Sequence, residues 1–289
     1  MLRERLWRNL VKRPSLFRVL WERWWTALWN SYVSDVTVRF LDLGARGGLR
    51  EAGPCAPLRY LKNVYAVGVE PDKEEAERLE HSGEYKRIFC EGVAGYTGEA
   101  FLYRSTICPS IKRGSRELFN WCGFNEFRVG SERGVPVRVK TPDDLLGEDK
   151  HFDFIKIDIH GVEYEVLSSM SDAFFEHATC IFVEVPLFHR YEGEVLSDEI
   201  IHLMRTKGFF LLDFDIDPRL AWPVESNAVF VKFPQETERE VLMLCLSSLL
   251  LAHYSRICFT SALYFKRRFS EHLAFFNALY KTKLFYKYT

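Results

Sequence analysis

The stretch FDFIKIDIHGVEYEVL, residues 152–167, decides the fold, because it reads as a buried strand that passes through a short turn into a helix. Apolar residues fill its first half, yet Lys156, Asp158 and His160 stand at alternate positions near the strand's end. Side chains of a strand point alternately to opposite faces, so these three should share one face of a sheet. Apolar residues then return at helical spacing and predict a helix over 161–171.

Similar apolar runs alternate with helical patterns over residues 36–233. Strands are predicted at 36–43, 64–70, 86–91, 153–159, 179–185, 209–214 and 226–232, and helices at 72–81, 161–171 and 197–207. This alternation is typical of an α/β domain with a largely parallel sheet, whose ligands bind beyond the carboxyl ends of the strands. Asp158 and His160 fall at such an end. Two further β-prone runs, 99–104 and 135–140, flank a Gly- and charge-rich insert, which is long enough to be a functional lid.

A glycine-rich turn follows the first strand, in VRFLDLGARGG, residues 38–48. Asp42 lies near the end of the strand, and Gly44, Gly47 and Gly48 come after it. Glycines let the backbone approach a ligand closely and tolerate positive φ, and this turn faces the ligand crevice of a doubly wound sheet. The spacing is not the GxGxxG of dinucleotide folds, so the motif alone also fits an ordinary tight turn.

The second strand ends in an acid, in VYAVGVEPD, residues 64–72. An acid at this place can accept hydrogen bonds from the ribose hydroxyls of a nucleotide-like cofactor. The alternative is that Glu70 interacts with the amino terminus of the following helix. The glycine turn stands at a suitable distance upstream, and this paired placement favours the ligand.

Composition describes an ordinary globular chain of 289 residues, 47% hydrophobic and 27% charged. Its seven cysteines are scattered, and no CxxC pair occurs. Neither a disulfide framework nor a zinc site is therefore predicted, and reduced thiols indicate a cytoplasmic protein.

The two ends of the chain are basic and its centre is acidic. Residues 1–34 contain seven Lys or Arg and two Asp or Glu, and residues 235–289 contain eight and four, within a net charge of -1. The basic residues do not cluster on a recognisable nucleic-acid-binding module, so no nucleic-acid partner is predicted.

Both ends also read as helical extensions, at 1–35 and 234–289, of the central domain. Pro14 divides the first, and an apolar stripe follows it (Phe17, Leu20, Trp21, Trp24, Leu28). This stripe packs on protein, in the same chain or in a second copy of a homo-oligomer, or residues 1–34 lie peripherally on an anionic membrane. No apolar stretch is long enough for a signal peptide or a spanning helix.

Taken together, these motifs resemble the FkbM family of methyltransferases. The resemblance is carried, in this order, by LDLGARGG (41–48), VGVEPD (67–72), TPDDLL (141–146), FIKIDIHGVEYEVL (154–167), FVEVPLFHRYEGE (182–194) and LMRTKGFFLLDFD (203–215). It covers about residues 36–232 and leaves both ends unmatched. It implies the class I, Rossmann-like methyltransferase fold, with a seven-stranded, mostly parallel sheet, helices on both faces, and S-adenosylmethionine (SAM) as cofactor.

The resemblance also implies a cofactor site. Its residues would be Asp42, Gly44, Ala45 and Gly48 at the methionine pocket, Glu70 with Pro71 at the ribose, and Gly92 and Val93 beside the adenine. Apart from the resemblance, Asp158 could hold the amino group of SAM. The chain departs from the family pattern at Arg46, where Asn is usual, and at His160, where Glu or Gln is usual. Pro54 and Pro57 should disrupt the first helix.

The implied acceptor is a hydroxyl on a sugar, a glycan or a secondary metabolite. A protonated hydroxyl is a poor nucleophile, so a base should speed its methylation by ~10²–10⁴-fold. The candidates are Asp158, His160 and His189, with Glu184 at the next strand end. Lys156 would orient Asp158 or a substrate carboxylate, or stabilise the negative charge that develops on an alkoxide. Each has a structural alternative: a helix cap for Asp158, a scaffold hydrogen bond for His160, an ion pair for Lys156. No metal is predicted; Asp158, Glu184 and a third oxygen ligand form the weaker alternative, suited to Mg²⁺.

Two functions follow from these expectations. The favoured one is a SAM-dependent O-methyltransferase. The other is a catalytically weak or inactive module of the same fold that docks on a membrane or a protein partner, which Arg46 and the two prolines suggest. An NAD-dependent oxidoreductase would share the acid after the second strand but is disfavoured by the absence of GxGxxG.

Overall fold

The computed structural model describes residues 14–103, 109–115, 134–215, 224–233 and 237–250, together with 274, 275 and 278. The chain divides into two compact units. The sheet unit comprises Arg39–Ala52 and Tyr65–Phe233, and the helical unit comprises Met1–Val38, Gly53–Val64 and Pro234–Thr289.

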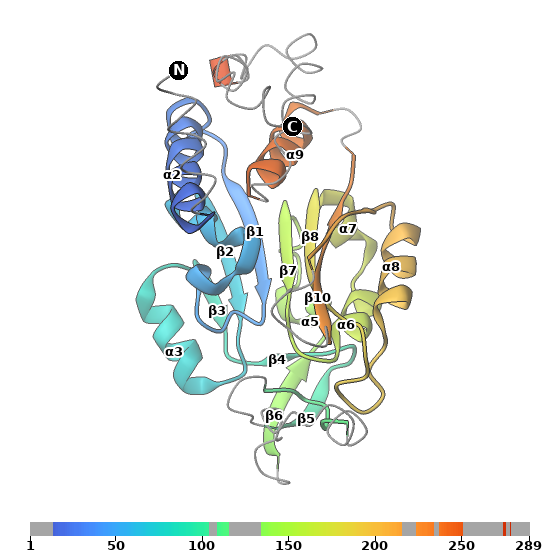
Figure 1. Cartoon of the computed structure of the whole chain (residues 1–289). Coiled ribbons are helices and arrows are strands. Elements are labelled where there is room, and N and C mark those ends of the chain that lie inside the picture. Colours follow the sequence, from blue (N-terminus) through green and yellow to red (C-terminus); the bar gives the residue numbers. More distant parts are fainter. Residues whose placement is uncertain are drawn as a thin grey trace. The chain divides into compact units, whose positions relative to one another are not determined.

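The main sheet has seven strands in the order β3-β2-β1-β7-β8-β10-β9 (Figure 1). The strands are β1 (Val38–Leu43), β2 (Val64–Val69), β3 (Arg87–Phe89), β7 (Phe154–Ile157), β8 (Cys180–Pro186), β9 (Phe210–Asp215) and β10 (Glu225–Val231). β7 pairs in parallel with β1 and β8, and β2 with β3, whereas β10 runs antiparallel to β8 and β9. All seven predicted strands are present, and the expected Rossmann-like α/β sheet is confirmed.

Strand order reverses between β1 and β7. The chain runs outward from β1 through β2 to β3, then returns to the other side of β1 with β7 and continues outward with β8. Such a reversal separates the loops at the carboxyl ends of the two central strands and leaves a crevice between them. The turn after β1 and the turn after β7 therefore both border the expected ligand site.

The helices of the sheet unit are α3 (Lys73–Ser82), α5 (Pro142–Leu146), α6 (Glu163–Ser169), α7 (Asp172–His177) and α8 (Ser197–Thr206). α3 begins at Asp72, whose side chain accepts hydrogen bonds from two backbone N–H groups, and ends at Gly83 in the left-handed conformation. α6 and α8 bury Val166, Leu167, Ile200 and Met204 in the core cluster of the sheet. The predicted helices at 72–81, 161–171 and 197–207 thus correspond to α3, α6 and α8.

A second sheet of three short strands has the order β4-β6-β5, with β4 (Gly92–Val93), β5 (Gly98–Leu102) and β6 (Val135–Lys140) (Figure 1). The two β-prone runs beside the insert are β5 and β6. The prediction for the third strand of the main sheet was too long, because β3 ends at Phe89 and the chain then leaves to pair Gly92 with Val139. Of the insert at 105–134, residues 109–115 and 134 are described.

The helical unit contains α2 (Pro14–Tyr32), the 3-10 helix η2 (Gly53–Tyr60) and α9 (Glu238–Leu250). The buried face of α2 carries Trp21, Trp25 and Trp29. The indole N–H of Trp21 donates to the carbonyl of Leu249 at 3.0 Å, and the ring of Trp29 meets Phe275 edge-on at 5.4 Å. This buried face therefore packs on protein.

The apolar stripe predicted for this helix differs in part from its buried face. It included Trp24 and Leu28, which are only half-buried, and omitted the fully buried Trp25. The i, i+4 spacing of the three buried indoles places them above one another on one face, which explains the difference. The side chains of Phe17 and Leu20, residues 1–13, and most of 251–289 lie outside the described residues.

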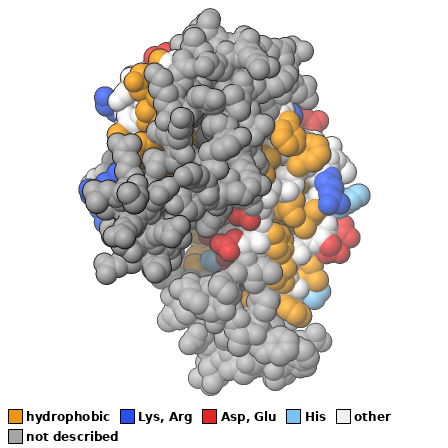
Figure 2. Space-filling model, turned by 45° about the horizontal axis from the view of Figure 1, so that its top comes forward, with side chains coloured by type: hydrophobic (Ala, Val, Ile, Leu, Met, Phe, Trp, Pro, Cys, Tyr) orange, Lys and Arg blue, Asp and Glu red, His pale blue; other side chains and the backbone are white. Residues whose placement is uncertain are grey.

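The segment after the glycine turn forms 3-10 helices instead of an α-helix, as its two prolines predicted. η1 (Leu49–Glu51) belongs to the sheet unit, and η2 contains Pro57. Within the described ranges, no helix has both the length and the apolarity to cross a membrane. Hydrophobic side chains reach the surface beside charged ones on the described part of the face in Figure 2, as is usual for a folded chain.

Candidate active site

The glycine turn brings the ends of β1 and β7 into direct contact. Gly44 has φ +87°, and a Cβ added there would lie 1.9 Å from the carbonyl oxygen of Asp158. The backbone N–H groups of Gly44 and Ala45 both donate to the carbonyl of Val69, at 3.1 and 3.0 Å. Only glycine fits at this position, and the turn is held between the ends of β2 and β7.

A cavity of about 200 Å³ opens beside this turn. Of the predicted cofactor-binding residues, those that line it are Gly44, Glu70, Pro71, Gly92, Val93 and Asp158. Of the predicted catalytic residues, those that line it are Lys156, Asp158 and His160. The structure therefore brings together most of the residues that the sequence analysis selected, at the carboxyl ends of β1, β2 and β7.

Five of the predicted cofactor-binding and candidate catalytic residues do not line the cavity, among them Glu184 of β8. Asp42 is buried at the end of β1, where it accepts a hydrogen bond from the hydroxyl of Tyr85 at 2.6 Å. Ala45 is buried, and Gly48 packs against Glu84. His189 is exposed, and its Nδ1–H donates to the carbonyl of Glu194 at 2.9 Å.

Glu70 is 3% exposed, and burial raises the pKa of its carboxyl group. One carboxylate oxygen accepts a hydrogen bond from the backbone N–H of Asp72 at 2.9 Å. The side chain that caps α3 is that of Asp72, so the helix does not depend on Glu70 for its cap. Arg46 approaches Glu70 to 4.0 Å and leaves its own side chain 53% exposed.

The sequence analysis missed the acid that holds the glycine turn. The backbone N–H of Gly47 donates to Glu75 at 2.8 Å, and Arg78 donates to the same carboxylate. These contacts, led by that of Arg78, lower the pKa of Glu75 to about 2, so this carboxylate is charged. An acid in the first turn of a helix gives no sequence signal of such a contact.

Lys156 joins β1 to β7. Its ammonium lies 3.3 Å from Asp42, the residue paired with it in the sheet, and 3.2 Å from Asp158. It also donates to the carbonyl of Gly44 at 3.2 Å. Burial alone would lower the pKa of Lys156, but attraction to Asp158 and Asp42 outweighs burial and raises it. Lys156 is therefore a fixed cation that orients Asp158, and it is not a base.

His160 has a left-handed backbone, with φ +55°, and no other described non-glycine residue has positive φ. Two neighbours hold this turn: the hydroxyl of Ser110 donates to the carbonyl of His160 at 2.5 Å, and Glu163 accepts from the N–H groups of Ile159 and Gly161 at 3.2 and 2.8 Å. Strained backbone of this kind concentrates at functional sites.

The imidazole of His160 lies between two carboxylates. Its Nδ1 is 3.1 Å from Glu184 and 3.8 Å from Asp158. Burial alone would lower its pKa, but the charge of Glu184 and the hydrogen bond to it raise the pKa to about 9. The ring is therefore a cation at neutral pH. Ile157 pairs with Val183 at the end of β7, so the turn that carries His160 begins beside Glu184.

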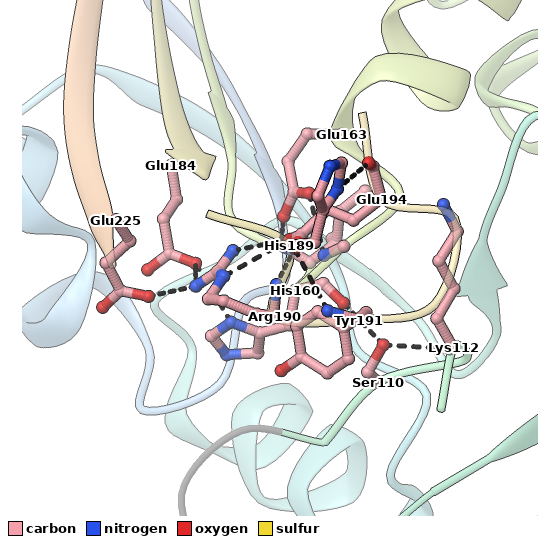
Figure 3. Close-up of polar contacts among 12 residues, drawn as sticks. Ser110, Lys112, His160, Glu163, Glu184, His189, Arg190, Tyr191, Glu194 and Glu225 are labelled. Atoms are coloured by element: carbon pink, nitrogen blue, oxygen red, sulfur yellow. Dashed lines mark hydrogen bonds and ion pairs between the residues drawn. The ribbon is translucent and has the colours of Figure 1, made fainter. Parts of the chain in front are cut away.

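Arg190 is the second residue that the sequence analysis missed. It is 2% exposed and comes from the loop after β8. Figure 3 shows its guanidinium directed at Glu184 and Glu225. It lies 2.9 Å from Glu184 and 3.2 Å from Glu194, and it also pairs with Glu225. An arginine in a loop gives no sign in sequence of which acids will surround it.

Residues 109–115 are attached to this loop. The N–H of Ser115 donates to the carbonyl of Arg190 at 2.7 Å, and that of Glu192 to the carbonyl of Arg113 at 2.8 Å. Lys112 reaches Glu165 at 2.5 Å and the carbonyl of Gly193 at 2.8 Å. The described part of the insert thus lines the cavity and is held by hydrogen bonds to the loop that carries Arg190.

Comparison with known proteins gives one family. Residues 44–211 match the Methyltransferase FkbM domain, a range that is more than half of the chain and includes both the cavity's glycine turn and Arg190. No curated protein matches the sequence significantly.

Two solved structures are similar at low identity. The magnesium protoporphyrin IX methyltransferase of Synechocystis PCC 6803 with bound SAM is 8% identical, over 73% of this chain and 79% of that one, with a TM-score of 0.34. The 1,6-didemethyltoxoflavin-N1-methyltransferase of Burkholderia thailandensis is 14% identical, over 74% and 79%, with a TM-score of 0.35.

Proposed function

Because the chain belongs to the FkbM methyltransferase family, we propose that it methylates a hydroxyl oxygen of a small molecule, most suitably a sugar or another polyol. Its cofactor is SAM, which supplies an electrophilic methyl group when bound. The observation that carries the choice of oxygen is Asp158, a carboxylate that lines the cavity with two cations, Lys156 and His160, in contact with it.

The described residues fit the cofactor. Glu70 is a buried carboxylate on the cavity wall, which suits it to accept hydrogen bonds from two ribose hydroxyls. Gly44 presents backbone without a side chain at the opposite strand end, and Gly92 and Val93 form a further wall. We propose that Glu70 holds the ribose, that Gly44 admits the methionine part, and that Gly92 and Val93 border the adenine.

The residues of the chain would then prepare the acceptor oxygen. One oxygen of Asp158 is held by the Lys156 ammonium at 3.2 Å, while the other is buried and has no hydrogen-bond partner among the described residues. The second oxygen is placed to take the proton of a bound hydroxyl. His160, as an imidazolium, would donate to the developing negative charge instead of acting as the base.

The test combines binding and transfer. Calorimetry should detect SAM binding by the wild-type chain, and Glu70→Ala should abolish it. Radiolabelled methyl transfer should then be measured with a panel of monosaccharides and polyols, and with matched amines that offer nitrogen but no free hydroxyl. A folded wild-type chain with no SAM affinity would refute the proposal, as would transfer to the amines alone.

The non-catalytic alternative depends on Arg46. Its side chain lines the cavity but is 53% exposed and lies near both Glu70 and Asp72, at 4.0 and 3.9 Å. A side chain this exposed can move aside when SAM binds, which favours the enzyme. The binding module would be favoured if the chain binds SAM but transfers no methyl group to any member of the panel, and if no substitution at position 46 restores transfer.

A further inference from the structure

The acceptor end of the cavity contains a cluster of three residues that suits a metal ion. Asp158, His160 and Glu184 each offer one ligand atom, and these atoms all lie within 4.8 Å of one another. They come from the ends of two neighbouring parallel strands, β7 and β8. Two carboxylate oxygens and one imidazole nitrogen, gathered around one point, are a mixed ligand set and not only a patch of acids.

One ligand atom in this cluster is unsatisfied. Oδ1 of Asp158 is buried and has no hydrogen-bond partner among the described residues, although it faces Nδ1 of His160 at 3.8 Å. A buried carboxylate oxygen without a partner costs free energy, and native structures rarely keep one without a ligand or water to satisfy it. The second oxygen of the same carboxylate is already occupied by Lys156.

The charges around the cluster also favour a cation. Arg190 is shared by Glu184, Glu194 and Glu225, and Lys156 is shared by Asp42 and Asp158. Acids therefore outnumber the permanently charged bases of this network. Arg190 also fixes the carboxylate of Glu184, as residues behind metal ligands commonly do.

The backbone at His160 orients the third ligand. Its left-handed conformation is held by Ser110 and turns the imidazole toward Glu184. Asp158 and His160 both line the cavity, so a metal ion between them would keep open coordination positions on the side where an acceptor binds. Glu184, in contrast, closes the cluster on the protein side.

We propose that Asp158, His160 and Glu184 bind a divalent transition-metal cation such as Mn²⁺, and that His160 releases one ring proton to solvent so that it coordinates as the neutral imidazole. Carboxylates suit Mg²⁺ and Mn²⁺, while an imidazole ligand favours transition metals over Mg²⁺. The inference rests on the proposed function for its chemistry: the cation would polarise the acceptor hydroxyl and replace the imidazolium in stabilising the developing negative charge. Asp158 would help to hold the cation, and the proton of the hydroxyl would pass to solvent in the cavity.

The test is Mn²⁺ titration of the full chain after chelator treatment, followed by electron paramagnetic resonance of the free ion. We expect one ion per chain, and no bound ion for Glu184→Gln or Asp158→Asn at the concentration that saturates the wild type. Glu165→Gln is the matched control: it removes the same charge from the ion pair with Lys112, outside the cluster, and should leave Mn²⁺ affinity within about twofold of the wild-type value.

Each result decides the matter. No Mn²⁺ binding by the wild type, or equal binding by the wild type, Glu184→Gln and Asp158→Asn, would overturn the metal site. If Glu184→Gln does not fold, Asp158→Asn carries the test, since its side chain is partly exposed. SAM calorimetry without metal is measured in parallel: SAM binding without Mn²⁺ binding refutes only the metal site, whereas Mn²⁺ binding without any methyl transfer refutes only the proposed function.

Discussion

The carbonyl oxygen of Asp158 occupies the space in which a side chain at Gly44 would begin. The two residues come from neighbouring strands, and the distance from a built Cβ to that oxygen would be 1.9 Å. The glycine turn of the proposed cofactor site and the turn that carries Asp158 and His160 are therefore in direct contact.

Gly44→Ala should destabilise the chain by more than about 2 kcal/mol, because it adds a clash with backbone to a positive φ. Urea denaturation measures the free energy of unfolding. Gly83→Ala is the control: its φ is +69° but no atom lies within 4 Å of the added Cβ, so it should cost only about 1 kcal/mol. Equal losses would show that the contact with Asp158 contributes nothing.

Glu70→Gln should weaken SAM binding by roughly 10–100-fold, since hydrogen bonds to a charged group are worth about 1.5–3 kcal/mol. Calorimetry gives the dissociation constant directly. Glu74→Gln removes the same charge from an exposed position in the first turn of α3 and should change the dissociation constant little. If both substitutions have the same effect, Glu70 acts only through long-range charge.

Asp158→Asn should lower the rate of methyl transfer by ~10²–10⁴-fold, because an amide neither accepts the acceptor's proton nor holds a cation as a carboxylate does. SAM affinity should stay within a few-fold of the wild-type value. Single-turnover transfer and calorimetry separate the two effects. An equal loss of both would place Asp158 on the cofactor's amino group instead.

Lys156→Met should destabilise the chain by about 3–5 kcal/mol, because it leaves Asp42 and Asp158 without their shared cation. The double variant with Asp42→Asn removes one of the two negative charges that lost their cation, and it should recover part of the lost free energy of unfolding. Thermal and urea unfolding of the two variants test this. No recovery in the double variant would mean that the packing of Lys156, and not its charge, is what matters.

The pH dependence of stability should include a contribution from Glu163. Burial raises the pKa of this acid from 4.5 to about 7, so the folded state binds its proton more tightly than the unfolded state does. The resulting stabilisation is complete below pH 4.5 and is lost as the pH rises to about 7. Up to about 3 kcal/mol of stability should disappear across that window.

The check is urea denaturation of the wild type and of Glu163→Gln between pH 4.5 and 7. The variant should show a smaller fall in the free energy of unfolding with rising pH, whatever its absolute stability. Parallel slopes for the two proteins would contradict the assignment to Glu163.

The sequence was sufficient for the sheet and for the inner part of the site. A period of two along FDFIKIDIHG predicts that Lys156, Asp158 and His160 share a face. Lys156 and His160 do both contact Asp158, but the strand ends at Ile157 and the left-handed turn at His160, not strand alternation, brings the imidazole there. The acid after the second strand was found for a similar reason, because strand ends in a parallel sheet meet at one edge.

The remainder depends on contacts that no local pattern encodes. Arg190 and Ser110 come from loops and reach the cluster only after β8 and the insert fold against it. The role of His160 also changed: a histidine pattern suggests a base, but the charge of Glu184 holds it protonated. The end of the third strand was misjudged because Gly92 and Val93 join another sheet.

Because strand order reverses once, the two parts of the candidate site come from different parts of the chain. The proposed cofactor contacts come almost entirely from residues before the insert, and the acidic cluster comes from residues after it. The loop after β8 can therefore vary while the contacts of the turn after β7 with Gly44 and Asp42 are kept. We expect a chimera that exchanges the loop after β8 for that of a relative to methylate a different molecule with the same methyl donor. In this fold the acceptor could then change through one loop.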